Sequence, residues 1–236
     1  MPNELLLIIS VVLIYSLVIV WYRLFGSRGL IGFSVLATVA ANIEVLIVIE
    51  AFGMEQTLGN VLFASTFLVT DILSETEGKK ASQRAVNIGI ATSVSFVLFS
   101  QMWLLYTPSS SDFVFPAVQT LFSGIPRVII ASLLVFAISQ RFDVWAYHKW
   151  WNFTEKKFGD RRKFLWLRNN GSTLLSQLLN TILFTFGAFL GTYELGTVIS
   201  IAASSYLIYI CTSLLDTPFV YLARYIYEKR QKTLQR

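Results

Sequence analysis

Carboxylates lie within one of the most apolar parts of this sequence, the stretch STFLVTDILSETEGKK from Ser65 to Lys80. Asp71 and Glu75 are four residues apart, so on a helix they share a face, which Phe67 and Phe63 continue on the two preceding turns. A carboxylate accepts two N–H donors from an amidine-like edge, and an aromatic face stacks on a heterocycle. This face therefore suits a small, planar, hydrogen-bonding solute, whereas the two rings can equally be ordinary packing residues.

Amide side chains lie in two further apolar segments. Asn42 is about 18 Å along a helix that starts at Leu30, near the middle of a membrane span, at 1.5 Å per residue. Gln177 and Asn180 are three residues apart and share a face. Amides can read a carbonyl and an N–H together, which complements the carboxylates. Glu44 lies on nearly the opposite face from Asn42, so it either pairs with a basic or hydroxyl group inside the bundle or has no part in the site.

Arg127 is a basic residue inside an apolar run, directly after Gly124, Ile125 and Pro126. The proline predicts a kink or a break near residues 124–126. Broken helices in transporters present unwound backbone to a substrate, whereas a plain kink would let Arg127 extend to the membrane surface. Asp216, also in an apolar segment, is either a ligand or a structural partner of Arg127 or of the basic residues nearby.

The sequence offers little for enzyme chemistry. The one histidine, His148, lies in a basic segment, so neither a Ser/His hydrolase nor a His-ligated zinc site can be assembled within the apolar segments. No phosphate-binding glycine loop is present, and Asp71 and Asp216 lack the glycine-flanked motifs of an aspartyl intramembrane protease. Cys211 stands alone, without a CxxC partner. We expect no catalytic residues, no cofactor and no metal.

The composition indicates an integral membrane protein. The chain has 236 residues, of which 55% are hydrophobic and 14% charged, against about 25% charged in a soluble domain. A helical span needs about 20 mostly apolar residues, and the runs lack the alternating polarity of membrane-spanning strands. We predict an all-α bundle of six to seven transmembrane helices in a single domain over residues 1–236, the number depending on whether the first segment spans. The segments are roughly 5–22, 30–49, 58–73, 85–105, 113–138 with a break near 124–126, 173–190 and 195–221.

The basic residues predict the orientation of the bundle, because short cytoplasmic loops collect Lys and Arg. The loops AFGMEQT, YTPSSSD and GTYELG contain neither residue, and every basic residue except Arg127 falls on the other side. This places the N-terminus outside and the C-terminus in the cytoplasm. The net charge of +5 then reflects topology, so no nucleic-acid partner is expected. The segment 141–168, with its interleaved Trp residues, is interpreted as a cytoplasmic loop anchored on the lipid bilayer.

Four segments resemble one known family, the queuosine precursor transporters, also grouped as vitamin uptake transporters. They are FLVTDILSETEGKKASQRAVNIGI, PRVIIASLLVFAISQRFDVWAYHKWW, LWLRNNGSTLLSQLLNTILF and LLDTPFVYLARY. The resemblance implies import of a 7-deazaguanine compound across the inner (plasma) membrane for tRNA modification. The candidates are 7-cyano-7-deazaguanine, 7-aminomethyl-7-deazaguanine and queuine. Matched to the family motifs, the expected site residues are Asn42, Asp71, Glu75, Arg127, Gln177 and Asn180, together with Gln140 and Asp143, which form either ligand contacts or a gate and helix-end network.

The leading hypothesis is a multi-pass transporter in which Asp71 or Glu75, with Phe67 nearby, binds the guanine-like edge, Gln177 and Asn180 read the carbonyl side, and Arg127 sets the electrostatics. Gln140, Asp143 and Asp216 are assigned to the gate or helix-end network. The alternative is a membrane-embedded capture subunit that binds a vitamin-like solute and needs a separate energising complex. The sequence leaves open the particular precursor, the energy coupling and whether the chain forms a homodimer.

Overall fold

The computed structural model describes residues 2–123, 126–159, 163–191 and 193–234. These residues are mostly helical, as the apolar segments predict. The helices are α1 (Asn3–Phe25), α2 (Ser27–Glu44), α3 (Gly59–Thr76), α4 (Lys79–Trp103), α5 (Phe115–Ser123), α6 (Pro126–Phe158), α7 (Leu165–Phe189) and α8 (Leu195–Leu234). Each predicted segment corresponds to one helix, except the fifth, which is divided between α5 and the first part of α6.

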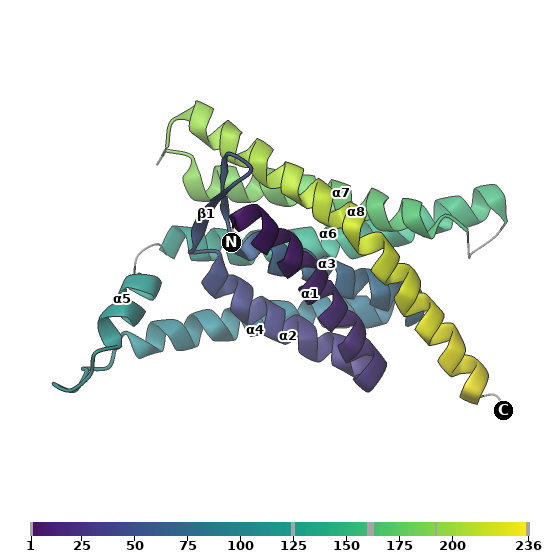
Figure 1. Cartoon of the computed structure of the whole chain (residues 1–236), viewed down its shortest axis with the longest axis horizontal. Coiled ribbons are helices and arrows are strands. Elements are labelled where there is room, and N and C mark those ends of the chain that lie inside the picture. The colour runs from purple at the N-terminus through teal and green to yellow at the C-terminus, as the bar shows by residue number, and fades with distance from the viewer. Residues whose placement is uncertain (1, 124–125, 160–162, 192, 235–236) are drawn as a thin grey trace.

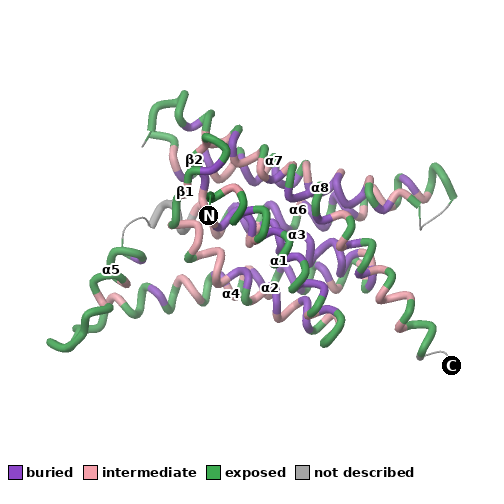
Figure 2. The backbone as a smooth tube through the Cα atoms, in the orientation of Figure 1, coloured by how far each residue is buried: buried purple, intermediate pink, exposed green. Residues whose placement is uncertain are grey.

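Helix α3 lies at the centre of the bundle. Of its 18 residues, all but three are buried, and it packs against α1, α2, α4, α6 and α8. Figure 2 shows the buried residues gathered around this central region and the exposed ones toward the ends. A helix covered on every side brings its polar residues into the interior together with its apolar ones. Asp71 and its neighbours are therefore inside the protein because α3 is.

A small β-hairpin departs from the all-α prediction. Strands β1 (Val48–Ala51) and β2 (Met54–Thr57) pair antiparallel, with Val48 opposite Thr57 and Ala51 opposite Met54. The two turn residues, Phe52 and Gly53, both have positive φ, as a two-residue hairpin turn requires. Helix α2 ends at Glu44, before the predicted end at 49, because the β-branched residues after it enter the hairpin instead.

The start of α1 holds this hairpin in place. The Asn3 side chain donates to the carbonyl oxygen of Glu50 at 2.8 Å, and the Phe52 amide donates to the Glu4 carboxylate at 3.0 Å. In Figure 1 the hairpin lies beside the N-terminal end of α1. The first helix is thus attached to the loop between α2 and α3 as well as to the bundle.

The segment 141–168 is largely helical instead of a loop. Helix α6 continues to Phe158 and α7 already begins at Leu165, and the two helices run side by side (Figure 1). Glycine explains the close approach, since a Cβ on Gly171 would meet the Trp150 ring at 3.0 Å. Trp150 therefore packs between the helices, whereas the sequence pattern suggested an anchor at the lipid surface.

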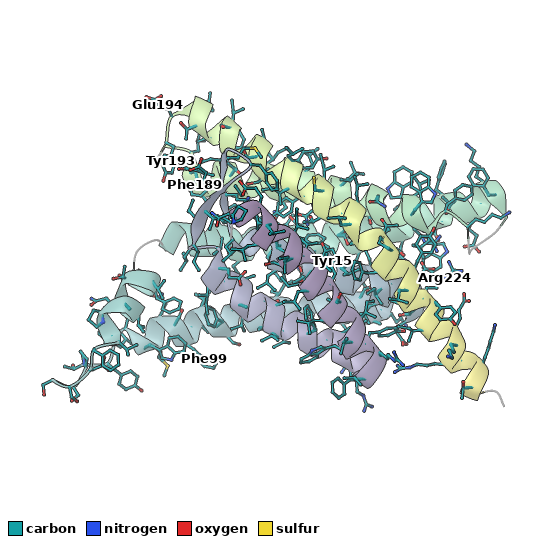
Figure 3. All side chains as sticks on the ribbon, viewed as in Figure 1. Tyr15, Phe99, Phe189, Tyr193, Glu194 and Arg224 are labelled. Carbon is teal, nitrogen blue, oxygen red and sulfur yellow. The ribbon has the colours of Figure 1, made fainter. Side chains whose placement is uncertain are left out.

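Among the described residues, four helices are long and apolar enough to cross a membrane. These are α1, α4, α7 and α8, the last over Leu195–Thr233. Large apolar side chains cover outer faces of the bundle: Leu98 and Phe99 on α4 are 62% and 57% exposed, and Figure 3 labels Phe99 there. Such a surface is unusual in a soluble monomer and suits contact with lipid.

Candidate functional site

A pocket opens between α2, α3, α4, α6, α7 and α8, next to the end of β2. It encloses about 580 Å³ of empty space, including the part open to solvent. Within the described chain, its lining consists of amide, hydroxyl, aromatic and small apolar residues and contains no Asp, Glu, Lys or Arg. The pocket is therefore electrically neutral and rich in hydrogen-bonding groups.

Asn42 forms one wall of the pocket. Its side-chain nitrogen donates to the backbone oxygen of Thr38 at 2.8 Å and to the Ser93 hydroxyl at 3.3 Å. The bond to Thr38, one turn earlier on α2, fixes the side-chain orientation. This leaves the amide oxygen of Asn42 as the group that the wall offers to a solute.

Another part of the lining joins three polar residues from three helices. The Tyr209 hydroxyl on α8 donates to Asn60 Oδ1 at 3.0 Å, and the Asn180 side chain of α7 lies beside it. The Asn60 amide nitrogen is buried and has no partner. An unpartnered buried donor is costly, so this group is ready to bind an acceptor that enters the pocket. The structure thus brings the two predicted residues Asn42 and Asn180 to one pocket.

Aromatic rings form the remaining side of the pocket. Phe63 lies in the lining with its ring 5.8 Å from Phe136 and 6.2 Å from Tyr209, measured between centroids. Phe67, the predicted site residue, is fully buried behind Phe63 at 5.3 Å and does not line the pocket. The rings give the pocket flat apolar surfaces on which a heterocycle can stack.

Two glutamines lie next to residues of the pocket lining without being part of it. Gln177 is 1% exposed, and neither its oxygen nor its nitrogen has a partner. It is three residues from Asn180 on the same face of α7. Gln140 on α6 donates to the Thr66 hydroxyl at 2.5 Å, and Thr66 itself lines the pocket. These contacts connect the pocket to the protein interior.

Three carboxyl groups meet in that interior. Asp71 on α3, Asp143 on α6 and Asp216 on α8 are at most 1% exposed. Asp71 accepts from Thr173 at 2.9 Å and Asp143 accepts from Ser176 at 2.7 Å.

The three carboxyls form one cluster. Asp71 and Asp143 lie within side-chain hydrogen-bond reach of each other, and Asp216 interacts electrostatically with both. Asp216 also accepts from Asn169 at 2.6 Å. We call Asp71, Asp143 and Asp216 the carboxyl core.

Glu75 belongs to a different environment from Asp71, one turn away. Its carboxylate accepts from Arg168 at 2.6 Å and from the Tyr147 hydroxyl at 2.8 Å, and it also pairs with Arg224 at 3.2 Å. The Arg168 guanidinium is fully buried and lies over the Trp151 ring at 4.5 Å. The structure therefore places Glu75 in an ion pair that joins α3 to α7 and α8, away from the pocket lining.

Two further sequence expectations are not carried into the site. The side chain of Arg127 and the predicted break at 124–125 lie outside the described residues. Glu44 is half-buried at the last position of α2 and does not line the pocket, although its neighbours Ala41 and Val45 do. In the described ranges, no group of three or more His, Cys, Asp or Glu residues could hold a metal ion.

Sequence reasoning missed Asn60, Tyr209 and Arg168. Asn60 sits at the start of an apolar segment and Tyr209 inside one, so neither stands out among the other polar and aromatic residues there. Arg168 was grouped with the surface charges of the basic segment. Its position directly before the polar run Asn169 and Asn170, on the same apolar helix, was the signal that it enters the bundle.

Comparison with known proteins places this chain in a family. A family model described as "Putative vitamin uptake transporter" matches residues 57–223. A protein of Bacillus subtilis (strain 168), named "Probable queuosine precursor transporter", is 39% identical over 210 residues, which are 89% of this chain and 90% of that protein. The chain belongs to the vitamin uptake transporter family. No solved structure matches it.

Membership in the vitamin uptake transporter family confirms the family predicted from the sequence motifs. Together with the apolar helices it identifies a membrane transport protein and not an enzyme. The matched residues include α3, α7 and the carboxyl core, whereas the pocket wall on α2 precedes them. Most of the pocket and the whole core thus fall within the part that this family shares.

Proposed function

We propose that this chain imports a queuosine precursor of the 7-deazaguanine type across the inner membrane, for use in tRNA modification. The observation that supports this most is the pocket, in which neutral amides face aromatic rings. A deazaguanine is flat and presents N–H donors beside a carbonyl acceptor. Amide oxygens can accept from its donors, the free Asn60 nitrogen can donate to its carbonyl, and Phe63 can stack on its ring. The relative in Bacillus subtilis carries the corresponding name.

The proposed path runs from the pocket to the carboxyl core. Gln177 lies between Asn180 and Thr173 on one face of α7, and Thr173 is bonded to Asp71. Asp71, predicted as the ligand of the amidine edge, does not line the pocket. We propose that the solute meets Asp71 only after it moves inward past Gln177.

We further propose that the seven helices α1, α2, α3, α4, α6, α7 and α8 span the membrane, with the N-terminus outside. Figure 1 supports this, because the hairpin, α5 and the start of α8 lie at one end and α8 finishes at the other. Figure 3 labels Glu194 at the first end and Arg224 toward the second. The loops without basic residues thus collect at the end where β2 and Thr57 border the pocket. In this orientation the pocket faces the outside, as import requires.

The test is uptake by cells that cannot make the precursor, followed by measurement of queuosine in their tRNA. Asn180→Ala removes one neutral hydrogen bond, worth about 0.5–1.5 kcal/mol, so we expect binding about 2- to 13-fold weaker. Asn152→Ala, at an exposed position of α6, is the matched control and should transport normally. Absence of queuosine with the wild-type protein present in the membrane would reject the function. Uptake unchanged by Asn180→Ala would reject the pocket.

Reconstitution of the purified chain alone in lipid vesicles distinguishes a transporter from a capture subunit. A transporter moves labelled precursor into the vesicle lumen. A capture subunit binds precursor, which raises its thermal stability by about 2.7 kcal/mol at 100 times Kd, but it transports none without its partner complex.

A further inference from the structure

Within the described residues, the carboxyl core contains more acidic groups than basic side chains neutralise. Asp71, Asp143 and Asp216 are fully buried or nearly so, yet no Lys or Arg forms an ion pair with any of them in the part of the chain that is described. The nearest guanidinium on α7, Arg168, is already paired with Glu75. A buried carboxylate without a counter-charge is far more costly than a protonated carboxyl, so groups in this position take up protons.

Several buried oxygen atoms around the core have no hydrogen-bond partner. Three of them are Asp71 Oδ1, Asp143 Oδ2 and Asn169 Oδ1. The amide oxygen of Asn169 can only accept hydrogen bonds, and the two carboxyl oxygens can donate only when they carry a proton. Asn169 is fully buried and its nitrogen already donates to Asp216, so its free oxygen lies beside the core. Protons on the carboxyls would supply the donors that these oxygens lack.

We propose that Asp71 and Asp143 share an exchangeable proton, and that the carboxyl core is the site through which a proton gradient drives transport. Thr173 and Ser176, three residues apart on α7, donate to Asp71 and to Asp143, so the two carboxyls lie next to each other, and two adjacent carboxylates cannot both remain ionised. The coupling step rests on the proposed transport function, whereas the proton site itself does not. A proton enters from the outside, is held by the pair, and is released to the cytoplasm with the solute.

The geometry favours a proton over a metal cation. A sodium or calcium ion needs several oxygen ligands arranged around it with room for the ion between them. Asp71 and Asp143 lie within side-chain hydrogen-bond reach of each other, and among the residues described no group of three or more His, Cys, Asp or Glu side chains could hold a metal ion. A proton needs only the two facing oxygens.

In the described ranges, the other titratable groups around the core are either neutral or paired. Tyr15 faces Asp71 and Asp216 from α1, with its hydroxyl donating to the Thr212 backbone at 3.2 Å, and Figure 3 shows it at the centre of the molecule. Tyr147 faces Asp71 from α6 while it donates to Glu75. Phenols remain neutral at physiological pH, so the pair titrates without a competing free charge nearby.

The proton site is connected to the pocket along two helices. On α7, Thr173, Gln177 and Asn180 follow one another on one face, from Asp71 to the pocket. On α3, Thr70 lies beside Asp71 and donates to Gln140 at 3.5 Å, and Gln140 donates to Thr66 in the pocket lining. A solute that reorients these side chains changes the hydrogen bonds available to the carboxyl pair. Solute binding and proton binding can therefore affect each other, as coupled transport requires.

The first test uses purified protein in vesicles with labelled precursor. Exchange of labelled for unlabelled precursor without any gradient tests the proposed function alone. An acidic exterior should then drive accumulation, up to about tenfold per pH unit for one proton carried with an uncharged solute. Asp143→Asn should abolish this accumulation, and Glu77→Gln, which removes an exposed carboxylate at the end of α3, should keep it. Exchange without accumulation, or accumulation under a sodium gradient alone, would overturn proton coupling and leave the transport function standing.

The second test needs no substrate. Infrared spectra of the wild-type protein at neutral pH should contain the carbonyl band of a protonated buried carboxyl, which disappears when the pH is raised. The difference spectrum between the wild type and the Asp71→Asn/Asp143→Asn double variant should contain this band, whereas the difference between the wild type and Glu77→Gln should not. Absence of the band from the first difference spectrum would overturn the proton site even if the vesicles transport nothing.

Discussion

The ion pair between Glu75 and Arg168 connects α3 to α7 where both side chains are buried. Glu75 is 4% exposed and Arg168 is not exposed at all, and both guanidinium nitrogens Nε and Nη2 donate to the carboxylate. Tyr147 adds a hydroxyl donor and Trp151 covers the guanidinium face. Removing one partner of such a buried, hydrogen-bonded ion pair is costly, because the other charge stays buried without a counter-charge.

Glu75→Gln should destabilise the protein by about 3–5 kcal/mol, because it leaves the Arg168 charge buried without its partner. The measurement is thermal unfolding of the purified protein in detergent. Glu77→Gln, at an exposed position two residues away, should change stability by at most about 0.5 kcal/mol. The double variant Glu75→Gln/Arg168→Gln should lose less than the two single variants together. An unchanged unfolding temperature for Glu75→Gln would contradict this role.

Residue spacing alone could predict that Asp71 lies in the interior, but not that Asp71 and Glu75 lie in different environments. Both share one face of α3 by their i, i+4 spacing, and that part is correct. Their environments differ because Asp71 meets Thr173 and Asp143 while Glu75 meets Arg168, and these partners come from distant parts of the chain. Local periodicity carries no information about which distant side chain lies opposite.

At the level of helices, the contact between α1 and α2 depends on a glycine. Gly29 lies on α2 directly against the end of α1, where an added Cβ would overlap the Trp21 carbonyl oxygen and come within 2.8 Å of the Phe25 Cβ. A backbone oxygen cannot rotate away as a side chain does. The two helices can be this close only because residue 29 has no side chain.

Gly29→Ala should therefore destabilise the protein by about 1–3 kcal/mol through overpacking. Gly187→Ala is the control, since its Cβ would make an ordinary contact at 3.7 Å with Ala131. At that position the better helix propensity of alanine should stabilise the protein by about 0.5–1 kcal/mol. Thermal unfolding in detergent compares the two variants, and equal shifts in the same direction would show that the α1–α2 contact is looser than described.

Hydrophobic runs located the long helices well because length and polarity determine them locally. The β-hairpin was missed because Val48 and Ile49 continue the apolar segment, AFGMEQT was interpreted as a plain loop, and the contacts with Asn3 and Glu4 are distant in sequence. The helical form of 141–158 was missed because basic and aromatic residues alternate there as they do in membrane-surface loops. Packing against α7 decides its structure.

For the whole molecule, the distribution of basic residues predicts how the bundle is oriented. Cysteine labelling tests this directly once Cys211, the one native cysteine, is replaced by Ser. Ser110→Cys, in the exposed connection between α4 and α5, should react with a membrane-impermeant maleimide in intact cells. Thr233→Cys, near the end of α8, should react only after the membrane is opened. The reverse pattern would show that the bundle has the opposite orientation. Labelling of both residues from outside would show that the number of spans differs from the one proposed.

The distance along the chain between Glu75 and Arg168 also affects how the protein is made. The two residues are 93 positions apart, so at about 5–20 residues per second the ribosome needs about 5–20 s to synthesise the arginine after the glutamate. During that interval α3 has left the ribosome while its carboxylate has no partner. The nascent chain must therefore keep Glu75 near water or beside a temporary partner until α7 arrives, which makes final docking of the central helix a late step of biogenesis.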